Sequence, residues 1–251
     1  MRSIRKLRGL PLGVLLYTDE GRDAQLSAEK IQAAAAQAKR VLVLRPGAVG
    51  GGVLLRRRGN RKFRLEVRGD SLASGRAHQQ ETALSWVLEQ LRVFSKFGTD
   101  RNEVVVSTLD LKTERHPMRL PHRVSATPML TYLDPKAADG VAAKIRAKLG
   151  KKGPHWELLR ESDRAPMKDR PVNVRLFKQL SVLATELEIP LKRDSSTWPS
   201  VAGLVSAKVA CLCGVGPATD NRGTPQEAVQ RISLIQQTLL LATFLVDQLK
   251  K

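Results

Sequence analysis

Two hydrophobic patterns along the chain restrict its fold more than any single motif does. Near the N-terminus, 12–17 and 41–44 are apolar at nearly every position, with a helical segment between them. Strands of this kind are buried on both faces, which is typical of a parallel sheet covered by helices. Further along, 61–68 alternates basic and apolar side chains, as a strand with one solvated face does. The sequence therefore predicts two different sheets.

The middle of the chain has the element order of a ferredoxin-like domain. Strands are expected at 61–68, 103–111, 123–133 and 155–159, and helices at 79–97 and 137–149. Arranged along the sequence, they follow the order β-α-β-β-α-β. This segment is expected to be inserted into another domain.

The outer segments return to the first pattern. Helices are expected at 27–40, 172–188 and 226–249, and buried strands near Leu191 and at 208–212. Thr224 and Glu227 have the spacing of a capping box for the last helix. The expected fold class is α/β. A partial doubly wound, mostly parallel sheet is built from 1–52 and 168–251, and a ferredoxin-like α+β lid is inserted at 53–167, behind a glycine hinge at 50–52.

The charge of the chain favours anionic partners. Lys plus Arg is 43 and Asp plus Glu is 24, a net charge of +19. The densest basic stretch, 56–68, suggests a basic nucleic-acid- or polyanion-associated scaffold protein, or a solvated strand face. Aromatic residues are only 4%, so stacking platforms for single strands are scarce. The candidate anion-binding residues are Arg56, Arg57, Arg58, Arg61, Lys62 and Arg64.

The cysteines and apolar runs indicate a cytoplasmic protein. Cys211 and Cys213 point to the same side of one strand and are poorly placed to bridge, which excludes a disulfide scaffold. The apolar run 10–17 follows basic residues as in a signal peptide, but 18–20 offers no small-residue cleavage site, so a buried strand is favoured. No run has membrane-spanning length, because 236–238 is polar.

Four stretches carry a family resemblance. They are Thr18-Asp19-Glu20 after a strand; the strand 41–44 followed by Arg45-Pro46; Arg57-Arg58-Gly59 with the glycines at 69 and 75; and Gly214-Val215-Gly216-Pro217 followed by Thr224-Pro225-Gln226-Glu227. Their order and spacing resemble the zinc metallopeptidase and aminoacylase family of acetylornithine deacetylase, succinyl-diaminopimelate desuccinylase and glutamate carboxypeptidase (peptidase family M-twenty). The resemblance covers nearly the whole chain.

This resemblance implies a two-zinc amidohydrolase or exopeptidase whose lid domain often dimerises. Paired metals ~3.5–4 Å apart need several carboxylates and imidazoles around them. Glu20 falls at the family's general-base position. The neighbouring ligand positions are Gly21, Arg45 and Gly223, and the lid histidine is Ala73. The family's His-x-Asp motif has no counterpart before the first strand.

These departures predict a non-catalytic or fragmentary homologue without zinc. Two explanations fit: the metal site has been lost, or the chain is a fragment of a longer protein. A homodimer through the lid is expected. Asp19 and Glu20 are expected to pair with Arg45 in the emptied site, since an unpaired buried carboxylate is costly; a vestigial base at Glu20 is the alternative. The four histidines have no spacing that suggests a metal site: His78, His116, His122 and His155.

Overall fold

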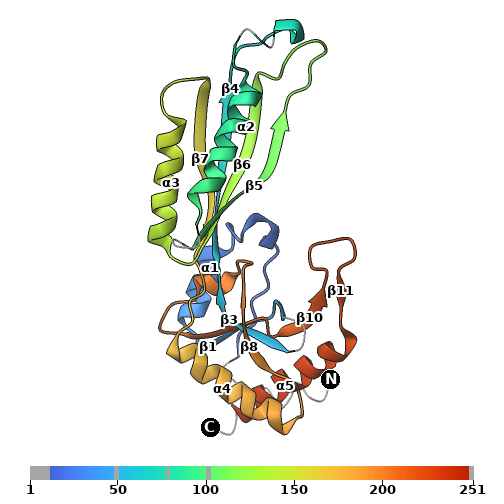
Figure 1. Cartoon of the computed structure of the whole chain (residues 1–251). Helices are drawn as coiled ribbons and strands as arrows, with labels where there is room; N and C mark the ends of the chain where they lie inside the picture. The colour runs from blue at the N-terminus through green and yellow to red at the C-terminus, as the bar shows by residue number, and fades with distance from the viewer. Residues whose placement is uncertain (1–11, 48–50, 77, 79, 100–102, 249–251) are drawn as a thin grey trace. The chain divides into compact units, whose positions relative to one another are not determined.

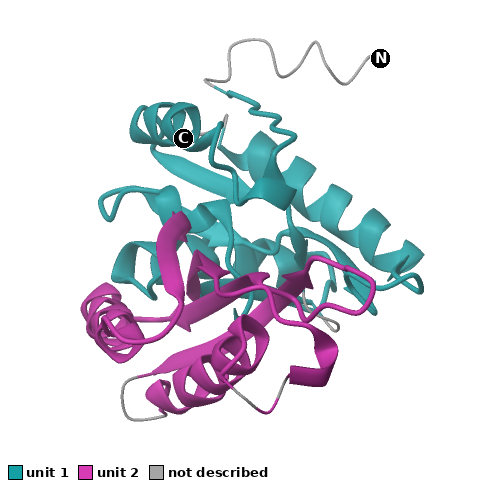
Figure 2. Ribbon diagram, turned by 90° about the horizontal axis from the view of Figure 1, so that it is seen from above, with its two compact units in different colours: residues 1–57, 167–251 teal, residues 58–166 magenta. Residues whose placement is uncertain are grey.

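The chain divides into two compact units. The computed structural model describes residues 12–47, 51–76, 78, 80–99 and 103–248. One unit comprises residues 1–57 and 167–251 and the other comprises 58–166 (Figure 2). The first boundary falls five residues later than expected, because residues 52–57 form a strand that pairs within the first unit.

The first unit is built on a mixed four-stranded sheet (Figure 1). Its strands run in the order β1-β9-β3-β8. β1 is parallel to β9 and β3 is parallel to β8, but β3 and β9 are antiparallel. The expectation of a mostly parallel sheet missed this central reversal, because 52–57 was not expected to be a strand. The bounds are β1 (Arg40–Val43), β3 (Gly52–Arg57), β8 (Lys192–Ser196) and β9 (Ala210–Cys213).

Helices cover both faces of this sheet, as expected for a doubly wound domain. Alternate residues of β9 point to opposite faces: Cys211 and Cys213 join the cluster under α1, and Leu212 joins the cluster under α4 and α5. Both cysteines are buried and free, as predicted. The helices are α1 (Ala28–Ala36), α4 (Pro171–Glu186) and α5 (Arg231–Asp247), with the short turns η2 (Glu20–Arg22) and η6 (Val201–Leu204).

Two expected elements of this unit are wrong. Residues 12–17 are not a strand, and Leu16 is 89% exposed. An apolar run becomes a strand only where a neighbour supplies backbone partners, and among the described residues none pairs with 12–17. The last helix begins at Arg231 instead of residue 226. Thr224 and Glu227 instead close a turn, in which Thr224 Oγ1 accepts from the amide of Gln226 and the Glu227 carboxylate accepts from the amide of Gly223.

That turn leads into a small second sheet that the sequence did not predict. β10 (Gly216–Asp220) pairs antiparallel with β11 (Ala228–Val229) and parallel with β2 (Pro46–Gly47). β2 follows β1 and β10 follows β9, so the small sheet lies beyond the carboxyl ends of those strands.

The second unit has the expected ferredoxin-like fold. Its antiparallel sheet runs β5-β6-β4-β7, and the hydrophobic cluster joins this sheet to α2 and α3. Phe63, Leu65 and Val67 of β4 face that cluster, as the alternation predicted. The strands are β4 (Gly59–Arg68), β5 (Val104–Thr113), β6 (Arg123–Tyr132) and β7 (His155–Arg164), and the helices are α2 (Ala83–Phe94) and α3 (Pro135–Leu149), with the turns η3 (Ser74–Arg76) and η4 (Ser95–Phe97).

Both helices of this unit begin at side-chain caps. Thr82 caps α2 in a reciprocal arrangement with Ser85, and Asp134 accepts from the amide of Lys136 at the start of α3. Within the described part of the chain, no helix is both long enough and apolar enough to cross a membrane.

Candidate functional site

Arg45 and Glu20 form an ion pair just beyond the carboxyl end of β1. The Nη1 of Arg45 contacts Oε1 of Glu20, and the hydroxyl of Tyr17 donates to Oε2 at 2.6 Å. The two side chains are 15% and 34% exposed, so water screens the pair only in part. Both oxygens of Glu20 are therefore engaged, which leaves this carboxylate poorly placed to accept a proton from a substrate water.

Asp19 does not take the role that was predicted for it beside Arg45. Its carboxylate accepts from the amide of Leu26 at 2.8 Å, from the amide of Ser27 at 3.1 Å and from the hydroxyl of Ser27. The Ser27 hydroxyl and these amides hold the pKa of Asp19 below its ordinary value, while burial acts in the opposite direction. Asp19 thus fixes the loop that leads into α1. Its carboxylate oxygens accept hydrogen bonds from donors seven and eight residues away in the sequence instead of pairing with Arg45.

The positions that the resemblance aligns with zinc ligands do not fit a zinc pair. Gly21 lies inside η2 and has no side-chain donor, and Arg45 places a cation where a ligand is needed. Gly223 has φ +77°, a backbone conformation that is costly for histidine. In the described part of the chain, no group of three or more His, Cys, Asp and Glu side chains could hold a metal ion.

The basic stretch 56–68 does not form the single anion-binding surface that was predicted. Arg57 is 1% exposed in the first unit and Arg61 is 5% exposed in the second. Neither side chain faces solvent, so neither can grip a phosphate on the surface. The sequence could not reveal this, because their partners lie far away along the chain.

Two other basic residues of this stretch, Arg58 and Arg64, are also engaged. Arg64 pairs with Glu161 at 3.1 Å, and Arg58 donates to the carbonyl of Thr131 at 3.1 Å. Arg58 and Lys62 are half-buried, whereas Arg56 and Arg64 are exposed. The stretch is thus divided between inward and outward side chains.

Arg61 is the centre of a polar cluster that sequence reasoning missed. Its guanidinium bonds Asp163 at 2.8 Å and Asp139 at 2.7 Å and lies 5.7 Å from the ring centre of Tyr132. Burial acts to lower the pKa of Arg61, but the two carboxylates outweigh it and raise that pKa. Burial and the bond from the Tyr132 hydroxyl to Asp163 raise the pKa of Tyr132. No spacing in the sequence relates these positions, which lie on three strands and a helix.

Arg57 is the second buried arginine of the stretch 56–68, and its surroundings differ. Its Nε donates to Cys213 Sγ at 3.1 Å and its Nη1 donates to the carbonyl of Trp198 at 3.1 Å. Its Nη2 is buried with no hydrogen-bond partner among the described residues. Ser200 lies 3.3 Å from the same sulfur. This guanidinium is thus held by neutral groups.

Glu114 and two histidines gather in the loop between β5 and β6. One Glu114 oxygen accepts from the amides of His122 and Arg123 and contacts His122 Nδ1, and the other lies 3.7 Å from His116 Nε2. Burial acts to raise the pKa of Glu114, but the amide of His122 and its neighbours lower it overall. Glu114 thus joins the start of the loop to its end at His122 and Arg123.

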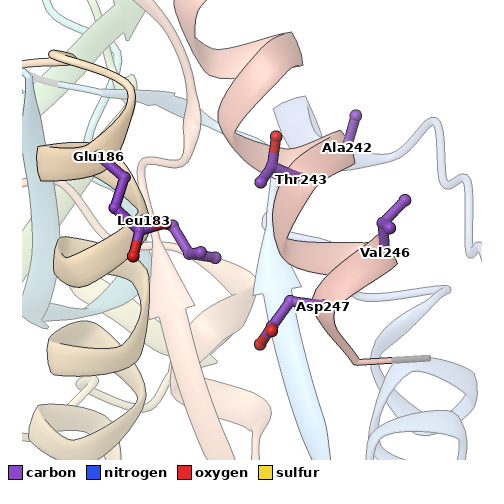
Figure 3. A pocket seen from close by; sticks show the side chains of 6 residues that line it. All are labelled: Leu183, Glu186, Ala242, Thr243, Val246 and Asp247. Atoms are coloured by element: carbon purple, nitrogen blue, oxygen red, sulfur yellow. The ribbon is translucent and has the colours of Figure 1, made fainter. Parts of the chain in front are cut away.

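A groove with a volume of about 360 Å³ lies between α4 and α5. Figure 3 shows the side chains that line it. Leu183 and Glu186 line it from α4, and Ala242, Thr243, Val246 and Asp247 line it from α5. Among the described residues that line this groove, the two acids, Glu186 and Asp247, offer no evident chemistry by themselves.

The comparisons with known proteins bear on the fold. No protein-family model and no curated protein sequence matches the chain. Among solved structures, it resembles aminopeptidase PepT from Bacillus cereus (13% identity, TM-score 0.64), with 90% of this chain and 63% of that chain aligned. It also resembles a tripeptidase from Staphylococcus aureus (12%, TM-score 0.65), with 87% of this chain and 62% of that chain aligned.

An amidase of the hydantoinase/carbamoylase family from Burkholderia vietnamiensis is similar as well, with 16% identity and a TM-score of 0.62. In that comparison, 82% of this chain and 53% of the amidase are aligned. This chain thus spans 53–63% of the length of these three proteins. Over that part, it has the fold of these peptidases and amidohydrolases.

Proposed function

We propose that this chain keeps the scaffold of a metal-dependent amidohydrolase or exopeptidase without its hydrolytic chemistry. The observation that carries the proposal is the ion pair between Arg45 and Glu20. A hydrolase of this kind needs a carboxylate free to accept a proton from water and a cluster of ligands for the metals. Here the carboxylate is neutralised by a guanidinium that stands at a ligand position.

The backbone at Gly223 supports the same proposal. Its left-handed conformation favours glycine, so a histidine ligand at this position would carry a strain of about 1–2 kcal/mol. Gly21 and Arg45 also lack ligand atoms for zinc. All three positions thus depart from a zinc site, Gly223 by its backbone conformation and Gly21 and Arg45 by their side chains.

Metal analysis of the purified full chain tests the proposal. After incubation with zinc and dialysis, we expect substoichiometric zinc and no hydrolysis of tripeptides or N-acyl amino acids. Wild type and Glu20→Gln are expected to behave alike in both measurements, because the carboxylate is not used as a base. About two bound zinc ions per chain, with amide hydrolysis that Glu20→Gln abolishes, would overturn the proposal.

We also propose that the second unit pairs two copies of the chain through β5. This strand lies at one edge of the sheet and exposes Val105 and Leu109, which are 54% and 50% accessible. An apolar edge strand with open backbone groups is a template for another strand. Light scattering of wild type is expected to give a dimer, and Val105→Lys with Leu109→Lys a monomer. A monomeric wild type, or a dimer that both lysines leave intact, contradicts this pairing.

A further inference from the structure

A cavity of about 250 Å³ lies in the first unit, beyond the carboxyl ends of β1 and β9. Gly47 in β2 and Gly214 after β9 form part of its wall. In open α/β sheets, ligands bind outside the carboxyl ends of the strands. Among the described residues, those that line the cavity carry no charged side chain. They are Gly47, Gly51, Gly52, Pro190, Gly214, Gly216, Ala218, Gln230, Ile232, Ser233, Gln236 and Gln237.

At two of these glycines, neighbouring backbone occupies the place where a side chain would stand. A methyl group on Gly47 would meet the carbonyl oxygen of Gly214 at 2.6 Å, and one on Gly51 would meet that of Pro190 at 1.9 Å. These positions therefore cannot carry larger residues with the backbone as it is. A small ligand in the cavity would approach the main chain directly.

The N-terminal end of α5 lies at the same cavity. Gln230, Ile232 and Ser233 belong to this end and line the cavity. Gln230 is the N-cap and makes no side-chain capping bond. The amide dipoles of a 17-residue helix favour negative charge at this end, and its first-turn N–H groups are donors. This end of the cavity therefore suits a carboxylate.

Gln237 supplies the second, independent feature. It is 7% exposed and lines the cavity, and its amide oxygen is buried without a hydrogen-bond partner among the described residues. It lies four residues after Ser233 on the buried face of α5, and helical side chains lean toward the N-terminus of their helix. A buried acceptor left unpaired costs about 1–3 kcal/mol, so it favours a ligand that donates to it.

We propose that this cavity binds a small carboxylate that carries an N–H or O–H donor beside the carboxylate, of which an α-amino acid is the simplest. The carboxylate lies at the N-terminal end of α5, and the donor bonds the amide oxygen of Gln237. An uncharged lining suits a ligand whose own charges balance. The volume is below that of sites for drug-sized ligands and admits only a small molecule. The inference uses neither Glu20 nor Arg45, so it stands apart from the proposed function.

Titration of the ¹⁵N-labelled full chain with glycine, glycolate and acetate tests this site by NMR. We expect glycine and glycolate to shift the backbone amides of Ile232 and Ser233 and the side-chain amide of Gln237 in a saturable way. Acetate keeps the carboxylate but lacks the donor, so it is expected to bind at least tenfold more weakly.

Gln237→Met removes the acceptor at nearly constant length. We expect it to bring glycine down to the affinity of acetate and to leave acetate unchanged. Gln226→Leu is the matched control, because Gln226 is exposed in the turn before β11 and does not line the cavity. The inference is wrong if glycine and acetate bind wild type equally, if none of the probes gives saturable shifts, or if Gln237→Met leaves glycine binding intact. If Gln237→Met does not fold, the comparison of glycine with acetate on the wild-type chain still tests the inference.

Discussion

Substituting Arg57 and substituting Arg61 are expected to affect stability differently, although both are buried arginines from one basic stretch. Arg61 is satisfied by two carboxylates, whereas Arg57 has neutral partners and an unpaired Nη2. We therefore expect Arg61→Met to destabilise the second unit and Arg57→Met to leave the first nearly unchanged. Methionine keeps much of the volume, so the comparison isolates the polar contacts.

The contacts of Arg61 set the expected magnitude. A hydrogen bond to a charged group contributes about 1.5–3 kcal/mol, and Asp163 is mostly buried at 28% exposure. Asp139 is 66% exposed, so its pairing is screened and adds about 0–1 kcal/mol. Arg61→Met should thus lower the free energy of unfolding by about 1.5–4 kcal/mol.

Arg57 should behave differently because its substitution removes an orphaned donor. The substitution loses the bonds to Cys213 and Trp198. It also removes the cost of burying the unpaired Nη2 and the cost of desolvating the guanidinium, and these gains offset the loss. We expect a net change within about 1 kcal/mol of zero. Arg64→Met is the surface control on β4. Its pair with Glu161 is about half exposed and should be worth less than about 1 kcal/mol.

Hydrogen exchange under increasing urea measures each unit separately, since the amides of β4 report on the second unit and those of β9 on the first. A double-mutant cycle of Arg61→Met with Asp163→Asn should give a coupling energy above about 1 kcal/mol. The reasoning fails if Arg57→Met costs as much as Arg61→Met, or if the cycle shows additive effects.

Three further outcomes follow from the structure. Leu240→Ala, at a fully buried position of α5, should cost the first unit about 2–5 kcal/mol in urea unfolding. Asp134→Ala should destabilise α3 by about 1 kcal/mol through loss of its N-cap, measured by amide exchange in that helix, whereas a cost near zero would contradict the capping role. The folded-state pKa of Glu114 lies below its ordinary value, so its stabilisation of the β5–β6 loop is present above the ordinary carboxyl pKa and is lost as pH falls through the folded-state pKa. The protection factors of the His122 and Arg123 amides, which correct for the intrinsic pH dependence of exchange, should fall over that acidic range in wild type and stay constant in Glu114→Gln.

Much of the fold could be predicted from periodicity because it depends on near neighbours in the sequence. Alternation in 61–68 identified the face of β4 that carries Phe63, Leu65 and Val67, and helical spacing placed α2 and α3. The sequence does not predict the strand β3, because its last two residues, Arg56 and Arg57, belong to the basic run 56–68 and 53–57 is expected in the lid. The capping-box spacing at 224–227 was misleading, because the same local bonds also close a turn.

By itself, the sequence determined the order of the elements in the ferredoxin-like unit, the insertion of that unit into another domain, the pairing of Glu20 with Arg45 and the residues at the positions that resemble zinc ligands. Only the tertiary structure decided that Asp19 binds the amides of Leu26 and Ser27, that Arg57 and Arg61 are buried, and that a glycine-walled cavity lies beside Gln237. The physical reason is separation along the chain. Periodicity reports contacts within a few residues, whereas Arg57 meets Cys213 and Arg61 meets Asp163 only after distant strands have paired.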